Sequence, residues 1–318
     1  MAITFPTSKI KYLNSSFQLP GDALFAQVGH TPLLPLHRIS AEFPNVEIYA
    51  KAEWFNPSGS VKDRAAREII LTAERDGLLT PDKVLLDATS GNMGIAYSTL
   101  CAARGYRVKL MLPANASYER IITLKALGAD LVLTDRFEGT DGAQLEARSR
   151  YAAEPDRYFY ADQYNNPANW RAHYRTTAPE IWEQTDGRVT HFVAGLGTSG
   201  TMTGTGRRLK ELNPNIELIA VQPDSPLHGL EGLKHMASAI KPGIFDAQLP
   251  DQNLTIGTEE SQSMVKRLAR EEGLFVGVSA GAAVATSLKI AAQIGQGVIV
   301  AVLPDSAYKY LSDKFWSE

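Results

Sequence analysis

Short apolar runs alternate with helix-patterned segments along most of this sequence. The runs expected to form strands span residues 47–51, 84–87, 108–112, 131–134, 158–161, 192–194, 218–221 and 298–303. Helical spacing of apolar residues predicts helices at residues 64–75, 95–104, 118–127, 144–153, 181–185, 204–212, 259–272 and 282–294. Because strands that alternate with helices pair in parallel and are covered on both faces, the pattern predicts an α/β fold with largely parallel sheets.

The length of 318 residues allows two domains or one large one, at roughly 150 residues per domain. No repeat, low-complexity tract or linker divides the chain. Residues 223–243 are rich in proline and glycine, and we expect them to form a long functional loop. We therefore expect two closely packed lobes that share a cleft.

Charge and cysteine content narrow the class of protein. A net charge of −3 gives no electrostatic reason to expect nucleic acid or an anionic membrane as a partner. No apolar run approaches the roughly 18 residues of a membrane span, and the N-terminus lacks a signal-peptide core. The single cysteine, Cys101, lies in an apolar helical run and cannot form an intrachain disulfide. We expect a soluble protein of the cytoplasm.

A polar, glycine-bearing turn at residues 56–64 carries one lysine, Lys62, directly before a predicted helix. The backbone dipole at a helix N-terminus disfavours a cation, so it helps a lysine to lose its proton. A neutral amine is the form that makes an imine with a carbonyl group. On position alone a solvated surface lysine is an equal alternative, and the motifs further along the chain favour the reactive one.

Two strand-to-helix junctions offer sites for anions. At residues 87–94, Thr89, Ser90 and Asn92 lie where exposed backbone N–H groups and the helix dipole favour negative charge, although a simple N-cap is the alternative. The junction at residues 191–201 is richer in glycine and hydroxyl groups. Glycine allows the backbone to approach a phosphate closely, so this second junction predicts a phosphate site.

Two other motifs in the sequence lack the partners that their usual functions need. The glycines from Gly195 onward match a dinucleotide fingerprint, but the next strand ends at Val221-Gln222-Pro223 without the required carboxylate. Residues 277–281 match the nucleophile elbow of serine hydrolases around Ser279, yet no histidine follows that serine. Ser279 is therefore expected to present a hydroxyl at a helix start, and no histidine or cysteine pattern predicts a metal site.

Taken in order, these motifs make the sequence similar to the fold-type II pyridoxal-phosphate enzymes, specifically the cysteine synthase and cystathionine β-synthase family. The similarity runs from residues 29–33 to residues 309–312 and includes residues 166–169 and 179–182. It implies two three-layer αβα lobes with mostly parallel sheets. The smaller, mobile lobe would span residues 54–160, and the larger, cofactor-binding lobe would span residues 1–53 plus 161–318.

The resemblance also implies a role for each motif. Lys62 would form the Schiff base with pyridoxal 5′-phosphate and act as the catalytic base. Asn92 would form a hydrogen bond with the pyridoxal hydroxyl, and Ser279 would face the pyridine nitrogen. The phosphate would be bound by Gly197, Thr198, Ser199, Gly200 and Thr201. The substrate carboxylate would be held by Thr89, Ser90, Asn92 and Gln163, beside Met93, which stands where the family usually has threonine.

The implied activity is synthesis of L-cysteine by β-replacement on O-acetylserine or O-phosphoserine, with a sulfide-type donor. Lys234 stands where a sulfur-carrier-dependent branch has a phosphate-recognising arginine. Lys234 would bind the phosphate of O-phosphoserine, or it is a solvated loop lysine. The resemblance further implies a homodimer and, in that branch, a sulfur-carrier protein as partner.

Other functions remain open from the sequence. The same chemistry with homocysteine would give cystathionine, and with an amine it would give a diaminopropionate derivative. The segment around Glu231 is more similar to the cystathionine synthases than to typical O-acetylserine sulfhydrylases. A nicotinamide-dependent oxidoreductase rests only on the glycine fingerprint. A catalytically silent binding protein of the same fold is disfavoured because Lys62, Asn92 and Ser279 are all present.

Overall fold

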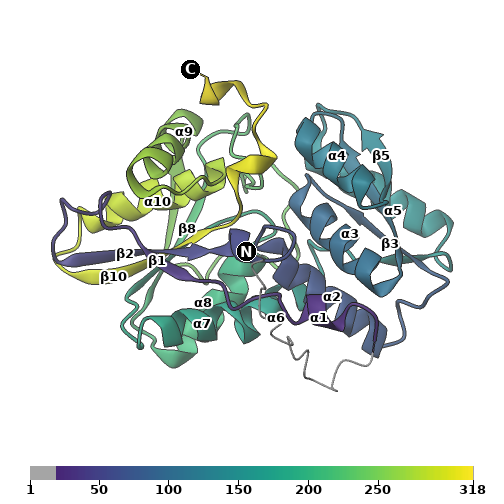
Figure 1. Cartoon of the computed structure of the whole chain (residues 1–318), viewed down its shortest axis with the longest axis horizontal. Helices are drawn as coiled ribbons and strands as arrows, with labels where there is room; N and C mark the ends of the chain where they lie inside the picture. The colour runs from purple at the N-terminus through teal and green to yellow at the C-terminus, as the bar shows by residue number, and fades with distance from the viewer. Residues whose placement is uncertain (1–18, 318) are drawn as a thin grey trace, which may run out of the picture.

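Two separate β-sheets organise the structure, a computed structural model that describes residues 19–317 (Figure 1). The larger sheet has the order β1-β2-β10-β7-β8-β9, and the smaller has the order β5-β4-β3-β6. Apart from the antiparallel pair of β1 and β2, all neighbouring strands are parallel. The strands are Leu33–Pro35 (β1), Val46–Ala52 (β2), Val84–Ala88 (β3), Arg107–Pro113 (β4), Asp130–Thr134 (β5), Tyr158–Tyr160 (β6), His191–Gly195 (β7), Glu217–Pro223 (β8), Gln252–Ile256 (β9) and Gly297–Leu303 (β10).

Helices connect the strands and cover both faces of each sheet. The α-helices are Asp22–Phe25 (α1), Lys62–Arg75 (α2), Asn92–Arg104 (α3), Tyr118–Ala126 (α4), Gly139–Ala153 (α5), Pro167–Arg175 (α6), Thr177–Gln184 (α7), Gly200–Leu212 (α8), Thr258–Arg267 (α9) and Val278–Ala291 (α10). Short 3-10 segments lie at Glu53–Phe55 (η1), Ala307–Lys309 (η3) and Lys314–Trp316 (η4), and a π-helical turn, Leu268–Glu272 (η2), continues α9. Within residues 19–317, no helix combines the length and apolar character that a membrane span needs.

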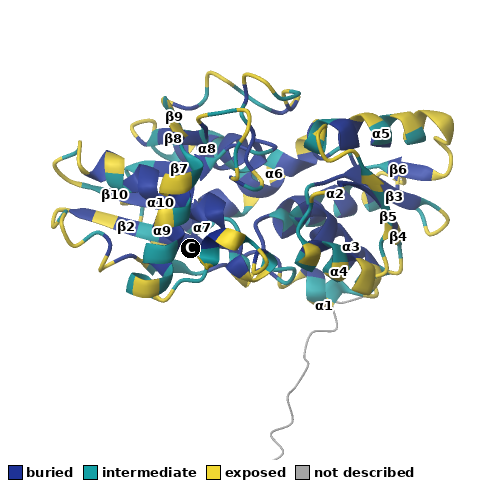
Figure 2. Ribbon diagram, turned by 90° about the horizontal axis from the view of Figure 1, so that it is seen from above, coloured by how far each residue is buried: buried dark blue, intermediate teal, exposed yellow. Residues whose placement is uncertain are grey.

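The central strand β10 shows why the larger sheet is buried on both sides. Successive side chains of a strand point to opposite faces. Ile299 and Ala301 pack with α9 and α10, whereas Val300 and Val302 pack with α7 and α8. The strand is therefore apolar at nearly every position, and the lobe has three layers; Figure 2 shows that the covering helix α10 is itself mostly buried.

The smaller sheet is built in the same way. Leu85 of β3 packs against α2 and α3, while its neighbours Val84 and Leu86 pack against α5 on the opposite face. Cys101, which lies in an apolar helical run of the sequence, is fully buried in the α2–α3 core. Two three-layer units thus lie side by side, each with its own sheet.

The α/β class and all eight predicted strands are confirmed, as β2 to β8 and β10. The sequence analysis missed the strands β1 and β9, which are only partly buried, and the helices α1 and α6. It also predicted one helix over residues 259–272, where the structure turns from α9 into a π-helical segment. In the predicted lobe boundaries, residues 1–18 and residue 318 lie outside the described residues.

A buried network of charges joins α2 to the larger lobe. The Arg64 guanidinium is 2% exposed and donates to Glu53 at 2.7 Å and to Glu180 at 2.7 Å. Lys51, fully buried, donates to Glu180 at 2.8 Å and to the Thr31 carbonyl at 2.7 Å. The two cations hold the pKa of Glu180 down, at about 2. The network anchors the helix that begins at the reactive-lysine candidate.

We expect Arg64→Met to lower the free energy of unfolding by about 3 kcal/mol or more, because it leaves two buried carboxylates without their main partner. Chemical denaturation followed by circular dichroism measures this change. Arg75→Met, on the same helix, removes an exposed ion pair with Asp76 and should leave the denaturation midpoint unchanged. Equal midpoints for the Arg64 variant and the native protein would contradict the anchoring role.

Candidate active site

A cavity of about 460 Å³ lies between the two lobes and adjoins a deeper pocket of about 30 Å³. Helices α3 and α8 begin at its walls, just after strands β3 and β7 end. Every residue that the sequence predicted for the site lines one or both of these spaces. The outer cavity has Lys62, Thr89, Ser90, Asn92, Met93, Gln163, Gly197, Thr198 and Lys234, and the deeper pocket adds Ser199, Gly200, Thr201 and Ser279.

Lys62 is the first residue of α2 and lines both spaces. Burial lowers the pKa of its ammonium group from the usual value, although the Asp305 carboxylate opposes this shift. The N-terminal end of α2 acts in the same direction as burial, because its partial charge is positive. The arrangement therefore favours a neutral amine that faces the cavity.

The junction between β7 and α8 forms a tight anion cradle. Ser199 adopts a left-handed conformation (φ 69°) at the N-cap of α8, so the free N–H groups of the first helical turn face the deeper pocket. A Cβ atom on Gly197 would lie 2.3 Å from the Gly232 carbonyl oxygen, and one on Gly200 would lie 2.0 Å from Asn169 Oδ1. The backbone can pack this closely only because both positions are glycine.

Two side chains show that the cradle fits a phosphate group. The Ser199 hydroxyl is buried without a hydrogen-bond partner, which a phosphate oxygen would supply. The Thr201 hydroxyl lies 3.3 Å from His173 Nε2, and His173 Nδ1 lies 2.9 Å from the Thr177 hydroxyl. Burial lowers the pKa of His173 to about 3, so the ring stays neutral and orients Thr201 without adding charge.

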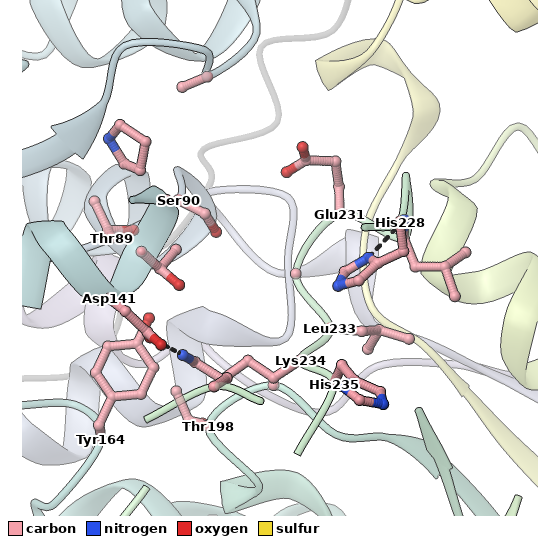
Figure 3. Close-up of a pocket in the computed structure, with 18 of the residues that line it drawn as sticks. Thr89, Ser90, Asp141, Tyr164, Thr198, His228, Glu231, Leu233, Lys234 and His235 are labelled. Carbon is pink, nitrogen blue, oxygen red and sulfur yellow. Dashed lines mark hydrogen bonds and ion pairs between the residues drawn. The ribbon is translucent and has the colours of Figure 1, made fainter. Parts of the chain in front are cut away.

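The second anion site is the loop that precedes α3. Thr89 Oγ1 accepts hydrogen bonds from the Gly91 N–H at 2.9 Å and the Gly94 N–H at 3.1 Å, which fixes the loop. The Arg120 guanidinium donates a hydrogen bond to the Ser90 carbonyl at 3.0 Å. Gln163 Nε2 donates to the Ala88 carbonyl at 2.6 Å. The loop is thus held rigidly, with the Ser90 side chain lining the cavity (Figure 3).

Met93, the departure from the usual family threonine, is the second residue of α3 and is 1% exposed. Its side chain belongs to the apolar core and also reaches the cavity wall. Met93 therefore offers no hydroxyl donor, and the polar groups of this loop that line the cavity are those of Thr89, Ser90 and Asn92. Ser279, near the start of α10, is 5% exposed and lines the deeper pocket.

The C-terminal segment contributes a polar network that the sequence analysis did not predict. Asn92 Nδ2 donates to Asp305 at 2.7 Å, and the Lys309 ammonium donates to Asn92 Oδ1 at 2.8 Å. The Tyr310 hydroxyl also donates to Asp305, at 2.6 Å. These residues are more than 200 positions from Asn92 in the chain, so no local pattern could have joined them. The network fixes Asn92 at the cavity from the opposite lobe.

Two ion pairs cross from the loop at residues 224–251 to the smaller lobe. Arg120 pairs with Glu231 at 2.8 Å, and Lys234 pairs with Asp141 of α5. Figure 3 shows the Asp141 and Lys234 side chains pointing toward one another beside Tyr164. The sequence singled out Lys234 as a phosphate-binding cation; it did not identify Asp141, which lies 93 residues away. In residues 19–317, no group of histidine, cysteine and carboxylate side chains is placed to hold a metal ion.

This protein is similar in sequence and structure to known proteins. The model of the family described as "Pyridoxal-phosphate dependent enzyme" matches residues 24–305. A cysteine synthase of Aquifex aeolicus is 50% identical over 303 residues, 93% of each chain. Cysteine synthase B of Salmonella typhimurium is 42% identical over 92% of this chain and 95% of its own. The crystal structure of a cysteine synthase from Entamoeba histolytica superposes with a TM-score of 0.87 at 34% identity, covering 100% of this chain and 94% of that one.

We expect Gly197→Ala to weaken binding of pyridoxal phosphate at least tenfold, because the added methyl group would push the cradle away from the Gly232 carbonyl. Titration of the cofactor into the apoprotein, followed by its visible absorbance, measures the affinity. Gly295→Ala is the control, because a methyl group there meets no atom within 4 Å. Unchanged affinity in the Gly197 variant would show that the close approach is not needed for the cradle.

Proposed function

The chain belongs to the family of pyridoxal-phosphate-dependent enzymes that includes the cysteine synthases, and we propose that it makes L-cysteine by β-replacement on an O-activated serine. The observation that carries this proposal is a lysine with a lowered pKa between two anion sites. One site suits a phosphate and the other an amino-acid carboxylate. Because Lys62 lines both spaces, an amino acid held by its carboxylate at the second site would have its α-carbon near the Lys62 amine.

The cofactor of this family is pyridoxal 5′-phosphate. When bound, it supplies an electron sink that stabilises negative charge at the substrate α-carbon. The residues proposed to hold its phosphate are Gly197 to Thr201, through the N-terminus of α8. Ser279, which lines the deeper pocket, would meet the pyridine nitrogen. A hydroxyl group does not keep that nitrogen firmly protonated, so the sink would be a weak one that favours prompt loss of the β-substituent.

The protein groups divide the reaction between them. The loop of Thr89, Ser90 and Asn92, with Gln163, binds the substrate carboxylate and fixes the α-carbon. Lys62, as a neutral amine, removes the α-proton while the Cβ–O bond breaks and acetate or phosphate leaves. A sulfide-type nucleophile then forms the Cβ–S bond, and Lys62 returns the proton to the α-carbon. Because the first product leaves before the nucleophile adds, we expect ping-pong kinetics.

Several properties of the assembly belong to the same proposal. Residues 54–160 form the smaller lobe, whose sheet shares no strand with the larger one, and any movement of this lobe over the substrate must open the ion pairs of Arg120 with Glu231 and of Lys234 with Asp141. The enzyme works as a homodimer in the cytoplasm, where its single buried cysteine needs no oxidising environment. Light scattering of the purified protein tests the dimer directly.

A sulfur-carrier protein is a candidate donor of sulfur.

We expect Lys62→Ala to lower kcat for cysteine formation at least a thousandfold, since the variant has no base at the α-carbon. The measurement is cysteine released from O-acetylserine and sulfide by the cofactor-loaded protein. The visible band of the bound cofactor should change as well, while the far-ultraviolet circular dichroism stays the same. Lys289→Ala removes an exposed lysine that pairs with Glu260 and should behave as the native protein. Substantial cysteine synthesis by the Lys62 variant would refute the mechanism.

A further inference from the structure

The carboxylate of Asp141 is held rigidly at the wall of the cavity. Its Oδ2 accepts the Ile240 N–H at 2.7 Å, and its Oδ1 accepts Gln144 Nε2 at 3.1 Å as well as the Lys234 ammonium. Lys234 also lies 5.2 Å above the Tyr164 ring, and its side chain is only 7% exposed. Each group of this pair is therefore fixed by contacts from both lobes, so the two charges stay together.

The pair decides the charge that the outer cavity presents to a substrate. Two lysines line this cavity: Lys62, which the reaction needs as a neutral amine, and Lys234. Its acidic lining residues are Glu138, Asp141 and Glu231. Because Asp141 neutralises Lys234 and Arg120 neutralises Glu231, no lysine charge is left over for a ligand. An incoming dianion would find the Lys234 ammonium group already paired with the Asp141 carboxylate.

The position of the substrate directs its β-substituent to this wall. With the carboxylate at Ser90 and Asn92 and the α-carbon near Lys62, the phosphate cradle occupies the deep side of the site. The remaining space lies outward, toward Asp141, His228 and Lys234 (Figure 3). A phosphate ester carries a charge of about −1.5 to −2 at pH 7, whereas an acetyl ester is neutral.

We propose that Asp141 is a specificity-determining residue that neutralises Lys234 and thereby selects O-acetylserine over O-phosphoserine as the donor. This rests on the proposed β-replacement activity. The repulsion between the Asp141 carboxylate and a phosphate ester acts in a partly desolvated cavity, where charges interact more strongly than in water. Removing the carboxylate charge frees the Lys234 ammonium for the phosphate, with little change in side-chain shape.

Asp141→Asn tests the proposal, with kcat/KM measured for both donors in the cofactor-loaded enzyme. We expect the ratio of O-phosphoserine to O-acetylserine to rise at least tenfold. The double variant Asp141→Asn, Lys234→Gln should lose this rise, because the gain depends on the freed cation. Asp141→Glu should keep the native ratio. Glu146→Gln makes the same charge change on an exposed face of α5 and should leave the ratio unchanged.

A binding measurement separates this role from catalysis. L-2-Amino-4-phosphonobutanoate has the shape and charge of O-phosphoserine but a carbon–phosphorus bond in place of the leaving oxygen. Its dissociation constant, from calorimetry, should fall at least tenfold in Asp141→Asn. An unchanged or lower donor ratio, with an unchanged dissociation constant, overturns the proposal. If the native enzyme makes no cysteine from either donor, the proposed function fails, while the calorimetric comparison still decides the role of Asp141.

Discussion

The carboxyl ends of parallel strands meet at one edge of a sheet, and this constraint places the two candidate anion sites at the starts of α3 and α8. In both lobes that edge faces the shared cavity, so the helices that follow the strands begin there. Helices α2, α3 and α8 each direct free N–H groups and a positive partial charge toward the same space. Such a space stabilises anions and disfavours an ammonium group. The two candidate anion sites thus have a common physical origin, whereas the lowered pKa of Lys62 is due to its burial.

The polar groups of the cavity are stabilised by partners from distant parts of the chain. Asp305 accepts from Asn92 and Tyr310 and so connects the C-terminal segment to the smaller lobe. One of its oxygens, Oδ1, is buried without a hydrogen-bond partner, so the carboxylate keeps acceptor capacity beside Lys62. Arg120 lies 4.5 Å above the Tyr310 ring and ties the same segment to the Ser90 loop. A shift of one lobe would therefore displace the Ser90 loop relative to the C-terminal segment.

Local patterns predicted the parts of this molecule that depend on nearby residues. The buried strands were found because parallel strands are apolar throughout. The residues predicted for the anion sites were recognised because glycine and hydroxyl groups gather at strand-to-helix junctions, and the structure brings them to the same cavity. The missed strand β1 has only three residues, and β9 is mostly polar in sequence, with only Leu254 and Ile256 apolar, so neither has the apolar run of a buried strand. Helix α6 was missed although Asn166 caps it and Pro167 begins it, a start signal that was available in the sequence.

What the sequence could not supply is the pairing of charges across the cavity. Lys234 was visible as a cation in a polar loop, but its partner Asp141 lies on a helix of the other lobe, and no spacing rule relates them. This difference matters for function because the two kinds of site discriminate differently. Backbone N–H groups at a helix start donate hydrogen bonds to any anion of suitable size. In the proposed role of Asp141, side-chain charges on the outer wall distinguish a neutral substituent from a charged one, and these charges are paired by a contact that the fold, not the motifs, creates.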